Sequence, residues 1–330
     1  MIKDVLTSRR NQFIIVGIIL VLAPLLISSD YYYHVVVFLF LNMILAVSWN
    51  LIFQTGQVSL AHVAFMAIGA YTSTLLVMRL EYPFLISFLL AGVLAAILAV
   101  IIGLIVLRLK GIYFVMITFA LTEIVRLSIT NSTGTLGGAS GISGIPYPSL
   151  FGYQIDSRVG FYYFFLAVLA VTIFIVYRIL HSRVGRVLRG ISNNETLSQA
   201  VGVNISYYKI FAFAMGAFFA GLAGALYAHY NTHISPHSFT FVRSFDIIIF
   251  NIVGGTSHLL GPILGSSIFT ILPEFFRSFA DYQVLVYSLA LILSILFLKD
   301  GFLSIIEGVK KQFKSKSDTK PEVKNYDHHV

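Results

Sequence analysis

The sequence predicts an all-α polytopic membrane protein, a bundle of about 8–10 transmembrane helices. Of its 330 residues, 58% are hydrophobic and only 11% are charged. Soluble domains are about half apolar and a quarter charged, so this composition excludes a soluble protein. Apolar runs long enough to cross a bilayer core of about 30 Å recur along the chain. The chain has no cysteine, which excludes disulfides, thiolate metal sites and cysteine nucleophiles.

The apolar runs divide the chain into a transmembrane domain and two polar ends. Residues 1–12 form a cytoplasmic N-terminus, residues 13–298 the membrane domain, and residues 299–330 a basic cytoplasmic tail rich in lysine. The eighth run is short and is interpreted either as a full span or as half of a broken helix. The expected spans cover residues 13–29, 33–53, 57–78, 84–107, 112–130, 159–180, 209–230, 243–256, 260–279 and 283–298.

The basic residues predict the orientation, because lysine and arginine gather on the cytoplasmic side of membrane proteins. With the N-terminus in the cytoplasm, 17 of the 22 basic residues fall on the inner side. Four fall on the outer side (Arg79, Arg158, Arg243 and Arg277), and Arg126 lies within a span. This asymmetry requires an even number of spans and places both termini in the cytoplasm. The formal charge of +8 therefore indicates membrane-flanking charge, and we expect no nucleic acid partner.

The longest outer loop, residues 131–158, contains six glycines and two prolines, which exclude a helix and predict turns. Two interpretations remain open for it. It is either a flexible connector or a backbone-rich surface at the outer mouth, in which case Gly137 and Gly138 line the substrate pathway.

Residues 182–204 form a polar island between two apolar runs, which the charge distribution places in the cytoplasm. In its second half, Ser192 is expected to cap a short helix and Glu195 to complete a capping box. Gly202 stands where that helix is expected to end. A short amphipathic helix between two spans requires a docking partner. Its small apolar face is expected to comprise Leu197, Ala200 and Val201.

Catalytic signatures are absent from the sequence, which contains no HExxH, no GxSxG and no P-loop. We therefore expect a transport subunit that is not an enzyme and holds no cofactor and no metal. If nucleotide energy drives the protein, ATP and magnesium bind to other chains.

Two glycine-rich segments, residues 55–71 and 254–265, place glycine, serine and histidine where an apolar helix begins. One interpretation is a broken helix that borders a substrate site, as in many transporters. The other is a tight turn near the cytoplasmic face. The pathway candidates in these segments are Gly56, Ser59, His62, Gly254 and Gly255, although His62 is expected to be a hydrogen-bonded packing residue.

Ionisable residues within membrane spans are costly and are functional by default. Glu123 and Arg126 are three residues apart, so they are expected to form an ion pair on one helix face. Asp246 has only Arg243, one turn earlier, as an obvious partner. It is interpreted either as half of an interior ion pair or as an acid that lines the pathway.

Small residues recur at four-residue spacing in two of the expected spans, and such stripes allow helix backbones to approach closely. We interpret them as packing surfaces without chemistry. They are Ala91, Ala95, Ala99 and Gly103 in one span, and Gly216, Ala220 and Gly224 in another.

Residues 185–204 resemble the cytoplasmic motif of LivM-type permeases, which belong to branched-chain amino acid ABC importers. The resemblance continues through GQVSLAHVAFMAIGAY, LGGASGISGIP, AGLAGALYAHYNTHISPHSFTF and GGTSHLLGPILG, and covers most of residues 54–277. It implies a core of inverted repeats of about five helices each, in the inner membrane. It also implies four kinds of partner: a LivH-type second permease, two cytoplasmic ATPases, a periplasmic or lipid-anchored binding protein, and the lipid bilayer.

The resemblance leads to one hypothesis and two alternatives. The hypothesis is a permease subunit that moves branched-chain or other hydrophobic amino acids inward by alternating access, driven by partner ATPases. The alternatives are an importer for urea, amides or nucleosides, and a stand-alone ion-coupled transporter. In the hypothesis the residues that couple the permease to the ATPase are Gly185, Arg186, Arg189, Gly190, Ser192, Glu195, Leu197, Ala200, Val201 and Gly202, with bends at Gly190 and Gly202.

Overall fold

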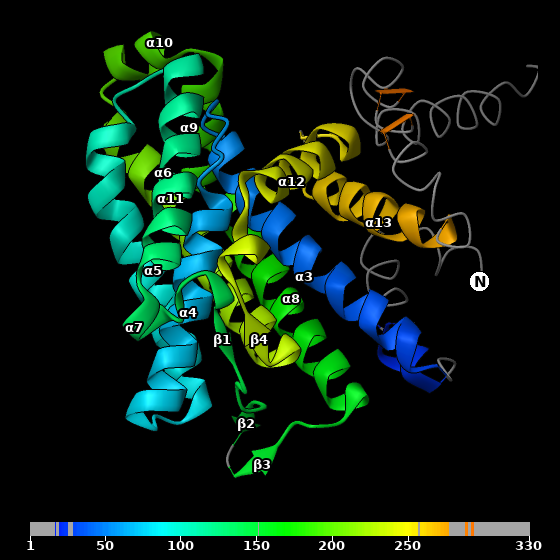
Figure 1. Ribbon diagram of the computed structural model, residues 1–330. Helices are drawn as coiled ribbons and strands as arrows, with labels where there is room; N and C mark the ends of the chain where they lie inside the picture. The colour runs from blue at the N-terminus through cyan, green and yellow to red at the C-terminus, as the bar shows by residue number, and fades with distance from the viewer. Residues whose placement is uncertain are drawn as a thin grey trace, which may run out of the picture.

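A computed structural model describes residues 20–25, 29–150, 152–256 and 258–276, together with positions 17, 288, 289, 292 and 293. Within these residues the protein is a helical bundle, and six helices are long and apolar enough to cross a membrane (Figure 1). This confirms the predicted class, a polytopic membrane protein. About half of the expected span at residues 13–29, and most of the expected span at residues 283–298, lie outside the described residues.

The six long helices lie close to the boundaries that hydropathy predicts. They are α3 (Asp30–Phe53), α4 (His62–Leu80), α5 (Phe84–Val106), α6 (Ile112–Asn131), α8 (Arg158–Leu180) and α11 (Ile205–Asn231). The shorter helices are α7 (Thr133–Leu136), α9 (Arg183–Asn193), α10 (Glu195–Ala200), α12 (Phe241–Gly254) and α13 (Leu260–Phe275). The remaining elements are η1 (Ala23–Leu25), η2 (Gly138–Ser140), η3 (Pro236–Phe239), β1 (Ile142–Ser143), β2 (Ser149–Leu150), β3 (Tyr153–Gln154) and β4 (His233–Ile234).

Helix α11 lies at the centre of the bundle, where it packs against α3, α4 and α5. The predicted small-residue stripes make these contacts. Ala91, Ala95 and Ala99 of α5 are fully buried. On α11, a Cβ atom added at Gly224 would overlap the backbone carbonyl of Met66 in α4. The stripes therefore allow three helices to pack backbone against backbone.

The two ends of the bundle carry different structures. Helices α9 and α10 lie together at one end, called here the α10 end, and the loop of residues 131–158 lies at the other (Figure 1). That loop is not a free connector, because β1 pairs antiparallel with β4, with Ile142 opposite Ile234. The expectation that it contains no helix is wrong by one turn, since Thr133–Leu136 forms α7. Gly138 is buried in this loop, and Gly137 has a positive φ of 76°.

The ion pair expected within the membrane is present. Arg126 Nη2 lies 2.7 Å from Glu123 Oε2, and both residues belong to α6. These two charges therefore satisfy each other, and the structure supports the structural role predicted for them.

Candidate functional site

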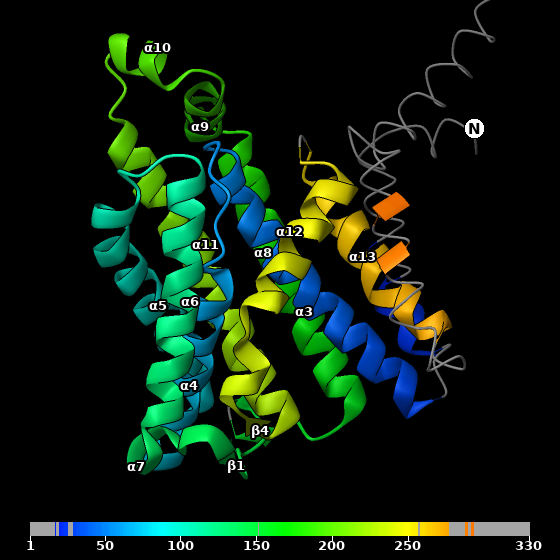
Figure 2. The ribbon, with the colours of Figure 1, turned by 45° about the horizontal axis from the view of Figure 1, so that its top comes forward.

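The chain between α3 and α4 breaks the helical pattern inside the membrane. The Leu60 N–H donates to Thr118 Oγ1 (3.1 Å), and the Leu60 carbonyl accepts from the hydroxyls of Thr122 (2.8 Å) and Ser244 (2.8 Å). The three hydroxyl groups therefore provide hydrogen-bond partners for backbone groups of Leu60 that lie outside any helix. Because Thr118 and Thr122 lie near the middle of α6, α4 begins at about mid-depth in the bundle (Figure 2).

Three of the pathway candidates, Gly56, Ser59 and His62, lie in this segment. The Ser59 carbonyl accepts a hydrogen bond from Trp49 Nε1 (2.8 Å). His62 is fully buried, and its Nε2 lies 2.8 Å from Ser48 Oγ. This hydrogen bond is the one expected of a packing residue, although the buried Nδ1 of the same ring has no hydrogen-bond partner among the described residues. Gly56 has a φ of +78° and begins the extended segment at the α10 end.

The second glycine-rich segment, residues 254–265, is a tight turn between α12 and α13. A Cβ added at Gly254 would overlap the Gly261 carbonyl, and one at Gly265 would overlap the Phe250 carbonyl. Gly255 ends α12 with a φ of 103°. The glycines serve the close packing of two antiparallel helices, so of the two interpretations the tight turn is correct here.

A second helix break lies in residues 232–240, between α11 and α12, which fits the interpretation of the eighth span as half of a broken helix. Thr232 ends α11 in the left-handed region (φ 57°), and Ile234 and Phe239 in the following segment are buried. Ser244, in the first turn of α12, bonds to the Leu60 carbonyl, so α12 also begins near mid-depth. The signal that identifies this break is the polar run NTHISPHS, with Pro236 unable to continue a helix.

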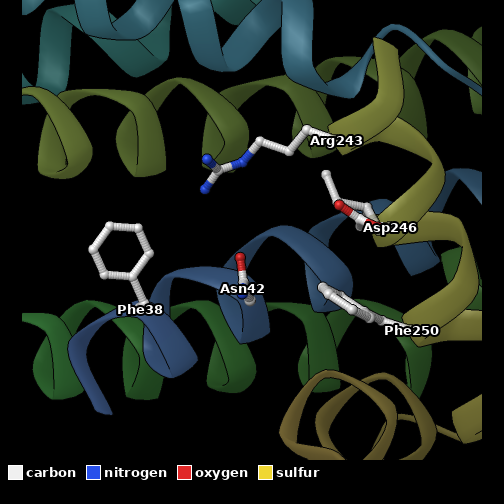
Figure 3. Close-up of a pocket in the computed structure, with 6 residues that line it drawn as sticks. Phe38, Asn42, Arg243, Asp246 and Phe250 are labelled. Atoms are coloured by element: carbon white, nitrogen blue, oxygen red, sulfur yellow. The ribbon is translucent and has the colours of Figure 1, made fainter. Parts of the chain in front are cut away.

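A polar cavity of about 200 Å³ lies beside the second break, between α3 and α12. Figure 3 shows the Arg243 and Asp246 side chains on its α12 side and the Asn42 amide on its α3 side. The sequence indicates Asp246 as a pathway candidate and places Arg243 on the outer side. The structure places Arg243 within the bundle, because the neighbouring Ser244 hydroxyl bonds to the Leu60 carbonyl. The cavity is lined by Phe38, Asn42, Arg243, Asp246, Ile247 and Phe250.

At the α10 end, the predicted helix is two helices with a different cap. Asn194 is the N-cap of α10, since its Oδ1 accepts from the Leu197 N–H (2.9 Å). The predicted N-cap and capping box at Ser192 are wrong, because α9 continues through Ser192. Two side chains of α9, Leu188 and Ile191, are buried and stabilise this continuation. Gly202 has a φ of +86° after α10, as expected for a helix end.

The other coupling candidates divide between buried and exposed positions. Gly185 is buried in the first turn of α9, and Gly190 lies within α9 and produces no bend, so that expectation is also wrong. Leu197 and Val201 expose 62% and 72% of their surface. Apolar side chains this exposed on a polar element indicate a contact surface. The remaining candidates Arg186, Arg189 and Ala200 are exposed as well.

Glu195 faces the bundle and joins α10 to two other elements. Its carboxylate lies 3.0 Å from Lys110 Nζ, before α6, and 3.1 Å from Lys209 Nζ, in the second turn of α11. Partial burial acts to raise the pKa of Glu195, but hydrogen bonds and charge from Lys110 and Lys209 outweigh it and hold this pKa below its ordinary value. These two ion pairs, called here the Glu195 clamp, fix α10 to the membrane helices.

The lowered pKa of Glu195 predicts how α10 responds to acid. A depressed carboxyl pKa stabilises the folded state above the ordinary value of 4.5, and this stabilisation is lost as the pH falls through the folded-state pKa. We expect amide hydrogen exchange in α10, corrected for its intrinsic pH dependence, to stay constant from pH 7 to 5 and to rise below pH 4.5. In Glu195→Gln it should be high throughout. Equal protection of the two proteins at pH 7 would contradict the clamp.

Helix α9 also touches the first helix break. A Cβ added at Gly56 would lie 3.2 Å from Ser192 Oγ and 3.3 Å from Ser192 Cα. The last turn of α9 therefore rests on the residue at which the chain turns from α3 into the membrane. This contact, called here the Gly56–Ser192 contact, joins α9 to the segment that precedes α4.

Together, a membrane bundle with two helix breaks near mid-depth, a charged cavity beside one of them and an exposed helix at one end define a helical transport protein. The chain belongs to the family described as branched-chain amino acid transport system / permease component, which matches residues 31–298.

The chain is also similar to permease proteins of branched-chain amino acid transport systems. The chain is 29% identical over 307 residues to the high-affinity branched-chain amino acid transport system permease protein LivM of Salmonella typhimurium, which covers 86% of this chain and 70% of that protein. It is 29% identical over 322 residues to LivM of Escherichia coli K12, covering 90% and 76%. The permease protein LivH of Escherichia coli K12 is 29% identical over 141 residues, covering 42% and 44%. No solved structure matches the chain significantly.

Proposed function

We propose that this chain is a permease subunit of an ATP-driven importer for branched-chain amino acids. The observation that carries the proposal is α10, a capped helix whose apolar residues Leu197 and Val201 point away from the bundle. The family supports the transport class and the substrate class over urea, amides, nucleosides and ion-coupled transport. In this proposal α10 enters a groove of a cytoplasmic ATPase.

The structure suggests how movement of the ATPase reaches the membrane. The Glu195 clamp ties α10 to the start of α11, where Lys209 is only 4% exposed. The Gly56–Ser192 contact ties α9 to the segment before α4. The Gly56–Ser192 contact reaches the first helix break directly, and the Glu195 clamp reaches α11, the helix that precedes the second break. In our proposal, closure of the ATPases shifts α9 and α10 together and changes the relative positions of α4 and α12.

The remaining parts of the importer follow from this orientation. The α10 end lies on the cytoplasmic side of the inner membrane. This orientation agrees with the arginines of α9, because basic residues gather on the cytoplasmic side. A periplasmic or lipid-anchored binding protein delivers the amino acid at the opposite end, where the loop of residues 131–158 lies. A LivH-type permease completes the pathway, and ATP and magnesium bind to the ATPases.

The exposed face of α10 gives a direct test of this proposal. We expect the double change Leu197→Asp and Val201→Asp to abolish association with the ATPases, because it places two charges in an apolar groove and each costs several kcal/mol, on the order of 3. Association is measured by co-purification of the ATPases with the permease from the same membranes.

The control at the same positions is Leu197→Met with Val201→Ile, which keeps the apolar surface and should keep association. Retained co-purification in the aspartate variant would contradict the docking role of α10. Loss in both variants would show that α10 acts through its folding and not through its apolar face.

A further inference from the structure

Helix α6 packs against the bundle with one side only. Its buried side chains lie on a single face of the helix and are Phe114, Thr118, Thr122 and Ile129. On the opposite side, Met116, Ile124 and Leu127 are exposed. An exposed side of a transmembrane helix meets either lipid or another protein, and the polar groups on it distinguish the two.

Glu123 and Arg126 reach this exposed side, because their side chains are 21% and 25% exposed. Glu123 directly follows Thr122, whose hydroxyl bonds to the Leu60 carbonyl near mid-depth, so its carboxylate lies near the middle of the membrane. Charged groups within membrane spans almost always face the interior of a bundle or a water-filled cavity, since exposure to lipid is costly. Lipid is therefore an unsuitable neighbour for this side of α6.

The ion pair neutralises the two charges but does not use all of their polar atoms. Arg126 Nε donates to Glu123 Oε2 (2.8 Å), and Arg126 Nη2 lies 2.7 Å from the same oxygen. In the described part of the chain, Glu123 Oε1 and Arg126 Nη1 therefore have no hydrogen-bond partner. Hydrocarbon provides none either. A protein that covers this side of α6 would supply a donor to Oε1 and an acceptor to Nη1.

The preceding helix, α5, shows a side of the bundle that suits lipid. Val93, Ile97, Ile101 and Leu104 are exposed on it, and α5 contains no charged residue. Both helices expose apolar side chains, but only α6 also presents an ion pair with an unused donor and an unused acceptor. This difference indicates that α6 meets protein where α5 meets lipid.

The ion pair also indicates what kind of protein fits. Related subunits that meet around a twofold axis bring the same side of each chain together, so each surface must complement itself. A Glu–Arg pair with one unused acceptor and one unused donor has this property, because a half turn places each arginine beside the opposite carboxylate. Since the chain is similar to both LivM and LivH, two permeases of one importer can be related closely enough to meet in this way.

We propose that the exposed side of α6, called here the α6 face (Met116, Glu123, Ile124, Arg126 and Leu127), is the contact surface for the second permease subunit. The second permease places an acceptor oxygen against Arg126 and a donor against Glu123, within an otherwise apolar contact. This inference rests on the proposed function and identifies the surface through which its two permeases join.

Photo-cross-linking in the complete importer tests the α6 face without altering the ion pair. Ile124 is replaced by the photoreactive residue p-benzoylphenylalanine, and the matched control is the same replacement of Ile97 on the exposed side of α5. Illumination should join position 124 to the second permease, as identified by mass spectrometry, and position 97 to lipid only. An adduct of position 124 with lipid alone, with a second copy of this chain or with any other protein would overturn the inference.

A charge-preserving substitution tests the part played by the guanidinium. Arg126→Lys keeps a positive charge beside Glu123 but removes the Nη1 donors. We expect recovery of the second permease with the purified chain to fall at least about tenfold, with an unchanged thermal unfolding midpoint of the isolated chain. Met116→Leu, which keeps the apolar surface of the same face, should keep full recovery.

The outcomes separate this inference from the proposed function. Unchanged recovery in Arg126→Lys, or lower recovery together with a lower unfolding midpoint, would overturn the contact between Arg126 and the second permease. Absence of a second permease from the unmodified complex would overturn the proposed function instead.

Discussion

Replacement of Gly224 by valine is expected to destabilise the bundle strongly. A Cβ at this position overlaps the Met66 carbonyl of α4, and backbone atoms cannot move aside as a side chain tip can. The two helices must then separate along their whole contact, and the expected loss of stability is about 3 kcal/mol or more. The measurement is the midpoint of thermal unfolding of the detergent-solubilised protein.

The matched control for this prediction is Gly134→Ala in α7, where an added Cβ meets no atom within 4 Å. It should unfold at the same temperature as the unmodified protein. A Gly224→Val protein with an unchanged midpoint would show that α4 and α11 do not approach as closely as described.

Replacement of Gly56 by valine is expected to stop transport in a protein that still binds its ATPases. Gly56 has a φ of +78°, which costs a branched residue about 1–3 kcal/mol, and its Cβ would press on the backbone of Ser192. The Gly56–Ser192 contact is then displaced while the exposed face of α10 is unaltered. We expect leucine uptake to fall at least about tenfold with co-purification of the ATPases retained.

A second substitution distinguishes this effect from simple strain. Ser192→Gly removes the side chain that faces Gly56, so Gly56→Ala with Ser192→Gly should recover part of the uptake that Gly56→Ala alone loses. Simple addition of the two losses would show that the contact carries no coupling between α9 and the helix break.

Hydropathy and charge predict the six long helices and the ion pair of α6, because these depend on local composition. They do not predict that α4 begins at His62. Val58, Leu60 and Ala61 are apolar and continue the pattern of a span, but hydroxyl groups of α6 and α12 bond to the Leu60 backbone and keep this stretch out of a helix. Those partners lie 58 to 184 residues away in the sequence. Long-range hydrogen bonds of this kind leave no periodic signal.

The same limit explains the errors at the α10 end and in the cavity. Ser192 and Glu195 match the capping-box spacing, but burial of Leu188 and Ile191 extends α9 past Ser192, and Asn194 becomes the cap. The sequence indicates Asp246 as a pathway candidate because a charge in a membrane span is unusual. It does not indicate Asn42 and Phe38 as lining residues, because only the packing of α3 against α12 brings them to the same cavity.

The central claim is that partner ATPases drive this permease through α10, and ATP-dependent uptake of labelled leucine into proteoliposomes tests it most directly. We predict uptake by the complete complex with ATP, none by this chain alone, and none when Leu197 and Val201 are both replaced by aspartate. Leucine uptake by this chain alone, driven by a proton or sodium gradient without ATP, would contradict the account.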